Sequence, residues 1–186
     1  MASRKEMMRL KYNITCANYD ELYGEEQREK YECTLRKTPG IKGIILDDGC
    51  GTALFVEFLK EKNMIKTIKS YICLDLTPCM LDKARERIER LNIGHIIDLV
   101  EADAEHIPLR SKSVDYTFSF TVIDLLEDIK QGVNEIDRVT RIRAYVSSLK
   151  KASNTMIKPA AKKYGLTLCE TSKDIVFMRE TKSSAG

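Results

Sequence analysis

The feature that most constrains the fold of this chain is a regular alternation of short apolar segments with longer amphipathic ones. Strand-like apolar segments occupy residues 43–47, 69–75, 96–103, part of 113–126, and 142–149. Segments with helical periodicity lie between them at 53–63, 77–92 and 127–140. A helix broken by a proline at 152–165, and two close strands at 166–171 and 174–180, complete the pattern.

This alternation predicts an α/β fold. Strands separated by helices are joined by right-handed crossovers, which makes them parallel and places helices on both faces of the sheet. The last two strands are only a short turn apart, which is too short for a crossover, so they must pair antiparallel. We therefore expect a doubly wound, Rossmann-like sheet of seven strands, mostly parallel, with an antiparallel hairpin at its C-terminal edge.

The length of 186 residues suits one domain. We expect residues 1–38 to form an N-terminal helical cover and residues 39–182 to form the core, with a break at the Thr-Pro-Gly sequence of 38–40. No apolar run approaches the roughly 20 residues of a membrane span, and the first residues lack the apolar stretch of a signal peptide. These features predict no membrane span and a cytoplasmic location.

The six cysteines show no metal-binding or disulfide pattern. None forms a Cys-x-x-Cys pair and the chain has only two histidines, so we expect no metal site. The spacing is also unlike that of a secreted disulfide framework. We therefore interpret the cysteines as free thiols, mostly small core residues, and assign Cys79 a packing role.

The sequence Asp-Asp-Gly-Cys-Gly-Thr-Ala at residues 47–53 follows the first strand and opens a helix, which is where such sheets bind ligands. Dinucleotides require a third glycine, which is missing, and Asp47 and Asp48 place negative charge where a pyrophosphate would lie. A phosphate-binding loop of the Gly-Lys-Ser/Thr type is also absent. A ligand that carries a sulfonium and an ammonium group fits better, and S-adenosylmethionine (SAM) is such a ligand.

Within that loop, Asp47 can accept hydrogen bonds from the amino group of SAM. Gly49, Cys50 and Gly51 form the turn, and its glycines let the backbone approach the ligand closely. Ala53 is small enough to start the helix against the sheet.

Two further acids end the next two strands. Asp75 follows the second strand and can accept from both ribose hydroxyls, as the acid of the dinucleotide fold does. Asp103 follows the third strand and can accept from the adenine amine, with the Ala104 N–H on a ring nitrogen. Leu76 and Ile107 are placed to sandwich the adenine.

These three motifs, in this order, resemble the class I SAM-dependent methyltransferases, especially the ubiquinone/menaquinone-methyltransferase-like branch. The resemblance covers roughly residues 40–180 and implies SAM as cofactor and S-adenosylhomocysteine as product. It departs from the family at Ala53, where a glycine is usual, and at Asp48, where the residue is usually apolar or neutral. The segment containing Tyr19 and Tyr23 resembles the part that closes over SAM in this branch, which places either tyrosine over the methionine end.

In a methyltransferase the methyl group should point past the end of the fourth strand. Phe120, Thr121, Val122 and Asp124 follow that strand. Asp124 is the carboxylate there, so it is our candidate for a general base or a substrate contact. The Asn/Asp-Pro-Pro-Tyr signature of adenine-N6 and glutamine-N5 methyltransferases is replaced by Ser-Phe-Thr-Val at 119–122, which disfavours those reactions.

The sequence does not identify the methyl acceptor. No insertion between the fourth and seventh strands is long enough to form a substrate lid. Either a large acceptor such as RNA or protein closes the site, or a partner subunit completes it. Some small members of the superfamily depend on a small zinc-binding activator protein that pairs with a sheet edge. The alternative function is a non-catalytic SAM-binding regulatory module, whereas an NAD-dependent oxidoreductase is excluded by the glycine spacing.

Overall fold

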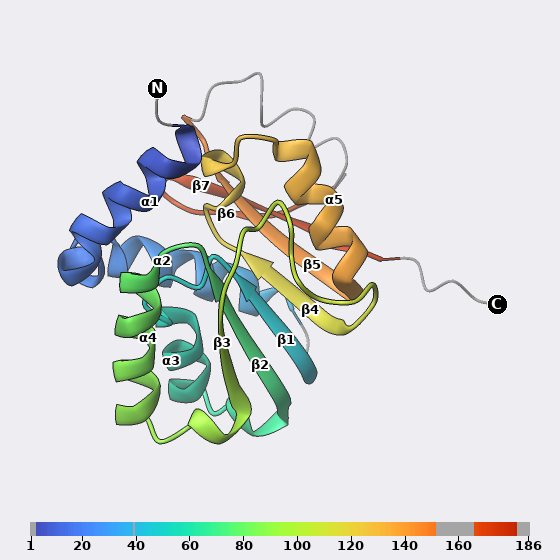
Figure 1. Ribbon diagram of the computed structural model, residues 1–186. Helices are drawn as coiled ribbons and strands as arrows, with labels where there is room; N and C mark the ends of the chain where they lie inside the picture. Colours follow the sequence, from blue (N-terminus) through green and yellow to red (C-terminus); the bar gives the residue numbers. More distant parts are fainter. Residues whose placement is uncertain (1–2, 39, 152–165, 182–186) are drawn as a thin grey trace.

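The computed structural model describes residues 3–38, 40–151 and 166–181 (Figure 1). The helices are α1 (Arg4–Thr15), α2 (Tyr19–Arg36), α3 (Leu54–Glu61), α4 (Pro78–Arg90) and α5 (Ile129–Val139), with a short 3-10 turn η1 (Cys16–Asn18) between α1 and α2. The strands are β1 (Gly43–Asp48), β2 (Ile68–Asp75), β3 (Ile97–Glu101), β4 (Val114–Ser119), β5 (Thr140–Leu149), β6 (Leu166–Glu170) and β7 (Asp174–Glu180).

The described strands form one seven-stranded sheet in the order β3-β2-β1-β4-β5-β7-β6. The pairs among β1 to β5 are parallel, whereas β7 pairs antiparallel with both β5 and β6. The expected doubly wound sheet with an antiparallel C-terminal hairpin is therefore confirmed. The chain order reverses between β1 and β4, so the loops after these strands diverge and leave room for a ligand at the carboxyl end of the sheet. The helix expected at 152–165 lies outside the described residues.

Two apolar clusters hold the layers together. One packs α2, α3 and α4 on the sheet through aromatic residues, among them Phe55, Phe118 and Tyr145, with the rings of the last two stacked at 4.8 Å. The other packs α5 on the opposite face through residues such as Val133 and Ile136. Because both faces of the central strands are buried, β4 is buried at every position.

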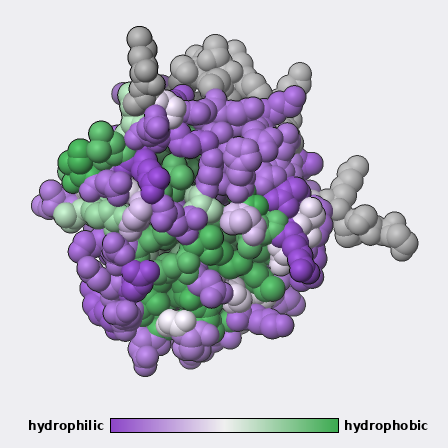
Figure 2. All heavy atoms as spheres, viewed as in Figure 1, coloured by the Kyte–Doolittle hydropathy of each residue, from purple (hydrophilic) through white to green (hydrophobic). Residues whose placement is uncertain are grey.

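The α5 side of the sheet is covered unevenly. Residues 102–113 connect β3 to β4 without a helix. Figure 2 shows apolar side chains gathered beside this connection, over β1–β3. Ile44, Ile72 and Leu109 of the second cluster are only partly buried. This face therefore carries α5 but no helix beside β3, because the β3–β4 connection is a loop.

Four of the six cysteines form disulfides, which corrects the expectation of free thiols. Cys16 is bonded to Cys79, and Cys33 to Cys169, with Cα–Cα distances of 6.1 Å in both pairs. Cys50 and Cys73 are free and buried. The bonded partners lie 63 and 136 residues apart, and they meet because the N-terminal cover folds back over the core. Cys79 therefore fastens the cover, which differs from the packing role expected for it.

None of the helices in the described part of the chain is both long and apolar enough to cross a membrane.

Gly43, at the start of β1, has a backbone that disfavours any side chain. Its φ is +89°, and an added Cβ would lie 2.2 Å from Oδ2 of Asp115. That carboxylate is held by the N–H of Ile44 at 2.9 Å and by Arg141, so it cannot easily move away. We expect Gly43→Ala to lower the free energy of unfolding by about 2–4 kcal/mol, as measured by urea denaturation.

The matched control is Gly24→Ala in α2. An added Cβ there meets nothing within 4 Å, and alanine favours a helix over glycine by up to about 1 kcal/mol. Equal stability losses in the two variants would contradict the strain assigned to Gly43.

Candidate functional site

A cavity of about 390 Å³ lies at the carboxyl ends of the parallel strands. This volume is within the range of small-molecule sites. Its floor is formed by the loops after β1, β2, β3 and β4, and its walls include α1 and α2. The lining residues are Lys5, Met8, Arg9, Lys11, Tyr12, Tyr19, Tyr23, Glu26, Gln27, Gly49, Gly51, Leu74, Asp75, Leu76, Thr77, Met80, Ala102, Asp103, Ala104, Glu105, Phe120, Thr121, Val122, Leu125, Leu126, Leu149 and Lys173.

The glycine loop after β1 lies against the cavity with its backbone in the left-handed region. Gly49 has φ +73° and an added Cβ would lie 2.2 Å from Val122. Gly51 has φ +55°, and an added Cβ would lie 3.7 Å from the ring of Tyr19. The N–H groups of Gly49 and Cys50 donate to the carbonyl of Leu74 at 2.8 and 2.9 Å. These hydrogen bonds hold the loop at the end of β2. The loop therefore presents bare backbone to the cavity at Gly49 and Gly51.

Ala53 takes the position of the third glycine with a left-handed backbone. It is the N-cap of α3, with φ 63° and ψ 35°, and it is fully buried. This conformation costs an L-residue about 1–2 kcal/mol and is the reason that glycine is favoured at such positions.

Asp75 is held in place by two backbone donors. Its Oδ2 accepts from the N–H of Gly51 at 2.9 Å, and its Oδ1 accepts from the N–H of Thr77 at 2.8 Å. Burial raises the pKa of Asp75, although these hydrogen bonds act to lower it. Each oxygen keeps a further lone pair, and the residue lines the cavity. A ligand with two hydroxyl donors could therefore be held here.

Asp103, Ala104 and Leu76 line the same cavity. Oδ2 of Asp103 accepts from Nζ of Lys5 at 2.5 Å, and Oδ1 accepts from the N–H of Glu105 at 2.9 Å. Burial acts to raise the pKa of Asp103, but Lys5 and the Glu105 N–H lower it below its usual range. The carboxylate is therefore anionic and already paired with the N-terminal cover.

Asp47 and Asp48 do not line the cavity. Asp47 accepts from the hydroxyl of Tyr71 at 2.7 Å, and Asp48 accepts from Ser119 at 2.9 Å, with Oδ1 of Asp48 lacking a hydrogen-bond partner. Burial raises the pKa of each to about 7, against the opposing effect of those hydrogen bonds. The structure therefore places both carboxylates behind the loop, inside the sheet layer.

Three other expected residues also lie off the cavity surface. Cys50 is buried within its loop, and Ile107 is buried in the second core cluster. Asp124 accepts from the hydroxyl of Ser148 at 2.7 Å and from the N–H of Leu149 at 2.8 Å. Its carboxylate is thus occupied at the end of β5, and this geometry offers no support for a role in the reaction.

The end of β4 is shaped by a buried polar network that the sequence did not reveal. Phe120 and Thr121 line the cavity, and Thr121 has φ +62°, which is rare for a β-branched residue. Its hydroxyl lies 2.6 Å from Nζ of the fully buried Lys30, which also pairs with Glu26 and Asp174 at 3.4 Å. This network fixes the backbone turn at the place where the transferred methyl group is expected.

The contribution of α1 was also missed. Lys5, Met8 and Tyr12 line the cavity, and Tyr12 and Tyr19 pack edge to face with ring centroids 6.3 Å apart. The helical period of this segment shows that a helix forms, but it does not show where that helix lies on the core. Tyr19 and Tyr23, one of which we expected over the methionine end of SAM, both line the cavity.

The comparisons with known proteins agree with this geometry. Residues 46–147 match the sequence profile of a family described as a methyltransferase domain. The chain belongs to this family. It is thereby a member of the class I SAM-dependent methyltransferase superfamily, as the motifs indicated.

Relatives and solved structures give the extent of the likeness. The chain is 36% identical over 97 residues to malonyl-[acyl-carrier protein] O-methyltransferase of Serratia marcescens, covering 52% of this chain and 34% of that protein. The chain thus spans about a third of the length of this relative.

Two solved structures share the fold. The magnesium protoporphyrin IX methyltransferase of Synechocystis PCC 6803 with bound SAM gives a TM-score of 0.75 at 13% identity, covering 98% of this chain and 99% of that one. A chain from the complex of the Haloferax volcanii Trm112 methyltransferase activator with a methyltransferase gives 0.61 at 20% identity, covering 74% and 59%.

The raised pKa of Asp48 gives a testable dependence of stability on pH. An aspartate in the unfolded chain has a pKa near about 4, so between about pH 4 and 7 the folded protein binds more protons at Asp48. The stability that this group contributes is present below pH 4 and is lost as the pH rises to 7. We therefore expect Asp48→Asn to stabilise the protein by about 1–3 kcal/mol at pH 8 and by less at pH 5, measured by urea unfolding.

Asp115→Asn is the control, because this buried carboxylate is paired with Arg141 and with the N–H of Ile44. It should lower the stability at both pH values. A loss of stability in Asp48→Asn at pH 8 would show that the negative charge of Asp48 is satisfied in the folded protein.

Proposed function

We propose that this chain binds SAM in the cavity and transfers its methyl group to an acceptor. The observation that carries the proposal is the alignment of Gly49 and Gly51, Asp75, and Asp103 with Ala104 along one cavity, from the ends of three successive strands. The residues present fit the cofactor: the glycine backbone lies beside the partly buried carboxylate of Asp75, and each oxygen of that carboxylate has a further lone pair. Membership of the methyltransferase-domain family supports the same reading.

The adenosine half would lie between β2 and β3. Asp75 accepts from the ribose hydroxyls, and the Asp75 carboxylate is aimed for this by the N–H groups of Gly51 and Thr77. Leu76 provides an apolar surface for the adenine, and Ala104 offers its N–H. Asp103 receives the adenine amine while its other bonds, to Lys5 and Glu105, keep it anionic.

The amino-acid half would lie between the glycine loop and α2. Tyr19, which lines the cavity beside Gly51, covers this end, and the hydroxyl of Tyr19 accepts from Gln27 at 3.1 Å. Glu26 lines the cavity there, with Oε2 paired to Lys173 at 2.8 Å and Oε1 to Lys30 at 3.4 Å, whereas Asp47 is turned inward and Asp124 does not line the cavity. Burial acts to raise the pKa of Glu26, but Lys173 and Lys30 lower it, so the carboxylate is anionic. We therefore assign the contact with the amino group to Glu26 in place of Asp47.

SAM supplies an electrophilic methyl on a sulfonium, and a neutral thioether leaves. The protein therefore has to align the acceptor atom and exclude water more than it has to provide charge. Phe120 and the Thr121 turn, fixed by Lys30, form the wall beside the expected methyl position. The N-terminal cover encloses the cavity on the side where Tyr12, Tyr19 and Tyr23 line it.

We propose RNA or protein as the methyl acceptor, and a partner protein that activates the enzyme. The partly exposed apolar side chains over β1–β3, the edge position of β3 and the likeness to a chain from an activator complex support a partner. The alternative is a SAM-binding regulatory module without catalysis, because Asp124 is occupied elsewhere. Disulfides persist in oxidising compartments and in the interiors of hyperthermophiles, and cytosolic disulfides are usually catalytic or redox-sensing. The expected cytoplasmic location therefore requires one of the last two cases for the two disulfides.

Asp75→Asn tests the binding mode. The variant keeps one acceptor oxygen but loses the charge, and a hydrogen bond to a charged group is worth about 1.5–3 kcal/mol. We expect SAM affinity, measured by isothermal titration calorimetry, to fall about 10- to 100-fold. Asp98→Asn on the neighbouring strand β3, where the side chain is exposed, is the control. Equal affinities for the wild type and Asp75→Asn would refute the ribose contact.

Transfer of labelled methyl from SAM tests the reaction itself. We expect label to enter the RNA or the protein fraction of a cell extract, and not the small-molecule fraction, because the described residues between β4 and β7 (114–151 and 166–180) form no substrate lid. Boiled enzyme and excess S-adenosylhomocysteine are the controls. SAM binding without transfer to any fraction, with and without added extract proteins, would favour the regulatory module.

A further inference from the structure

The N-terminal cover forms one wall of the proposed SAM site but is weakly attached through α1. No residue of α1 is buried, and Met7, Leu10 and Ile14 are 52%, 62% and 72% exposed. Lys5 pairs with Asp103 and Glu105, and Arg9 with Glu101, and the cation of each pair is partly or largely exposed; exposed pairs contribute about 1 kcal/mol or less. Arg4 and the N–H of Lys5 add two exposed hydrogen bonds, to the carbonyl of Asp124 and to Glu127. Without the disulfide, α1 is therefore held over the cavity by partly exposed polar contacts and by no buried residue of its own.

The Cys16–Cys79 disulfide lies where the two walls of the cavity meet. Cys16 is in η1, between Tyr12 and Tyr19, and both tyrosines line the cavity. Cys79 is in the first turn of α4, between Thr77 and Met80, which line it from the other side. The N–H of Cys79 also donates to Oδ1 of Asn13 at 3.3 Å. The covalent bond therefore joins the cover to the core at the rim of the site.

We propose that the Cys16–Cys79 disulfide is a redox-sensitive fastening that keeps the N-terminal cover closed over bound SAM. This inference rests on the proposed function. An external dithiol supplies two electrons and two protons, breaks the S–S bond, leaves two cysteine thiols and is itself oxidised to a disulfide. Cys79 is only partly buried, so a reductant can reach the bond. Reduction leaves α1 with its exposed contacts and opens the site.

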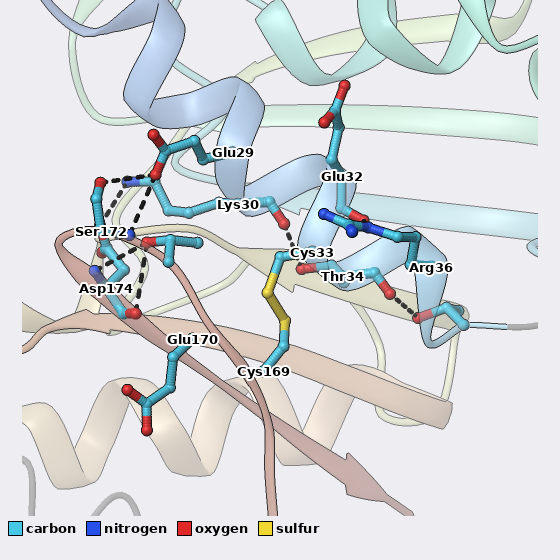
Figure 3. Close-up of a disulfide and its surroundings, with 12 residues drawn as sticks. Glu29, Lys30, Glu32, Cys33, Thr34, Arg36, Cys169, Glu170, Ser172 and Asp174 are labelled. Carbon is cyan, nitrogen blue, oxygen red and sulfur yellow. Dashed lines mark hydrogen bonds and ion pairs between the residues drawn. A yellow bond between two sulfur atoms is a disulfide. The ribbon is translucent and has the colours of Figure 1, made fainter.

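The second disulfide fastens a different region and provides a matched comparison. Cys33 of α2 is bonded to Cys169 of β6, at the edge of the sheet, among Glu32, Thr34 and Glu170 (Figure 3). No residue within three positions of either cysteine lines the cavity, whereas Tyr19, Thr77 and Met80 lie that near to Cys16 or Cys79. Without this bond α2 is still held, because Tyr31 packs on Phe55, Phe58 and Phe120 and the buried Lys30 pairs with Asp174. Its loss should lower stability without opening the site.

The test compares Cys16→Ser/Cys79→Ser with Cys33→Ser/Cys169→Ser and with the wild type. SAM affinity is measured by calorimetry, and SAM dissociation by stopped-flow tyrosine fluorescence, since the chain has no tryptophan. We expect the first variant to bind SAM at least about tenfold more weakly and to release it faster, because a tether at the rim gives a high effective concentration. The second variant should match the oxidised wild type. Treatment of the second variant with dithiothreitol should reproduce the weak binding.

Hydrogen exchange of the amides of residues 4–15, without ligand, keeps the test independent of SAM. We expect faster exchange in Cys16→Ser/Cys79→Ser than in the other two proteins. Unchanged exchange of α1, or unchanged SAM affinity in this variant, would overturn the fastening. Failure of the oxidised wild type to bind SAM, with faster α1 exchange in the variant, would instead refute the proposed function and leave the fastening supported.

Discussion

The geometry of the site depends on one carboxylate with two backbone hydrogen bonds. Asp75 ends β2, and it binds the N–H of Gly51 in the loop after β1 and the N–H of Thr77 at the start of α4. These bonds lock together the two loops that face the ligand across the sheet. They also stabilise the ionised form of a partly buried acid and so oppose the rise in its pKa that burial causes. The Asp75 carboxylate thus fixes three things at once: the position of the glycine loop, the start of α4, and the direction of its own oxygens toward the cavity.

The fold followed from the sequence because its determinants are local. Apolar runs of five to eight residues, separated by helical periods, specify a parallel sheet, and the short link between the last strands specifies a hairpin. The same logic located Asp75 and Asp103, since parallel strands end at one edge of the sheet. Strand-end residues are therefore the part of a site that a single sequence can place.

Side-chain direction and long-range contacts could not be predicted in this way. Neighbouring residues Asp47 and Asp48 belong to a strand end, but whether a carboxylate turns toward the cavity or toward Tyr71 and Ser119 depends on those distant partners. Asp124 likewise accepts hydrogen bonds from the hydroxyl of Ser148 and the N–H of Leu149. The pairing of Lys5 with Asp103 and both disulfides depend on where the N-terminal cover docks, which periodicity does not specify.

Ala53 shows how a departure from a family pattern can be nearly neutral. Its left-handed backbone costs the folded state about 1–2 kcal/mol. An alanine, however, has fewer conformations than a glycine in the unfolded chain, which offsets about 0.4–1 kcal/mol of that cost. Its methyl group is fully buried in the apolar cluster and offsets about a further 0.8 kcal/mol. Alanine in place of glycine at position 53 therefore changes the free energy of unfolding very little. The loop can keep the same backbone with either residue.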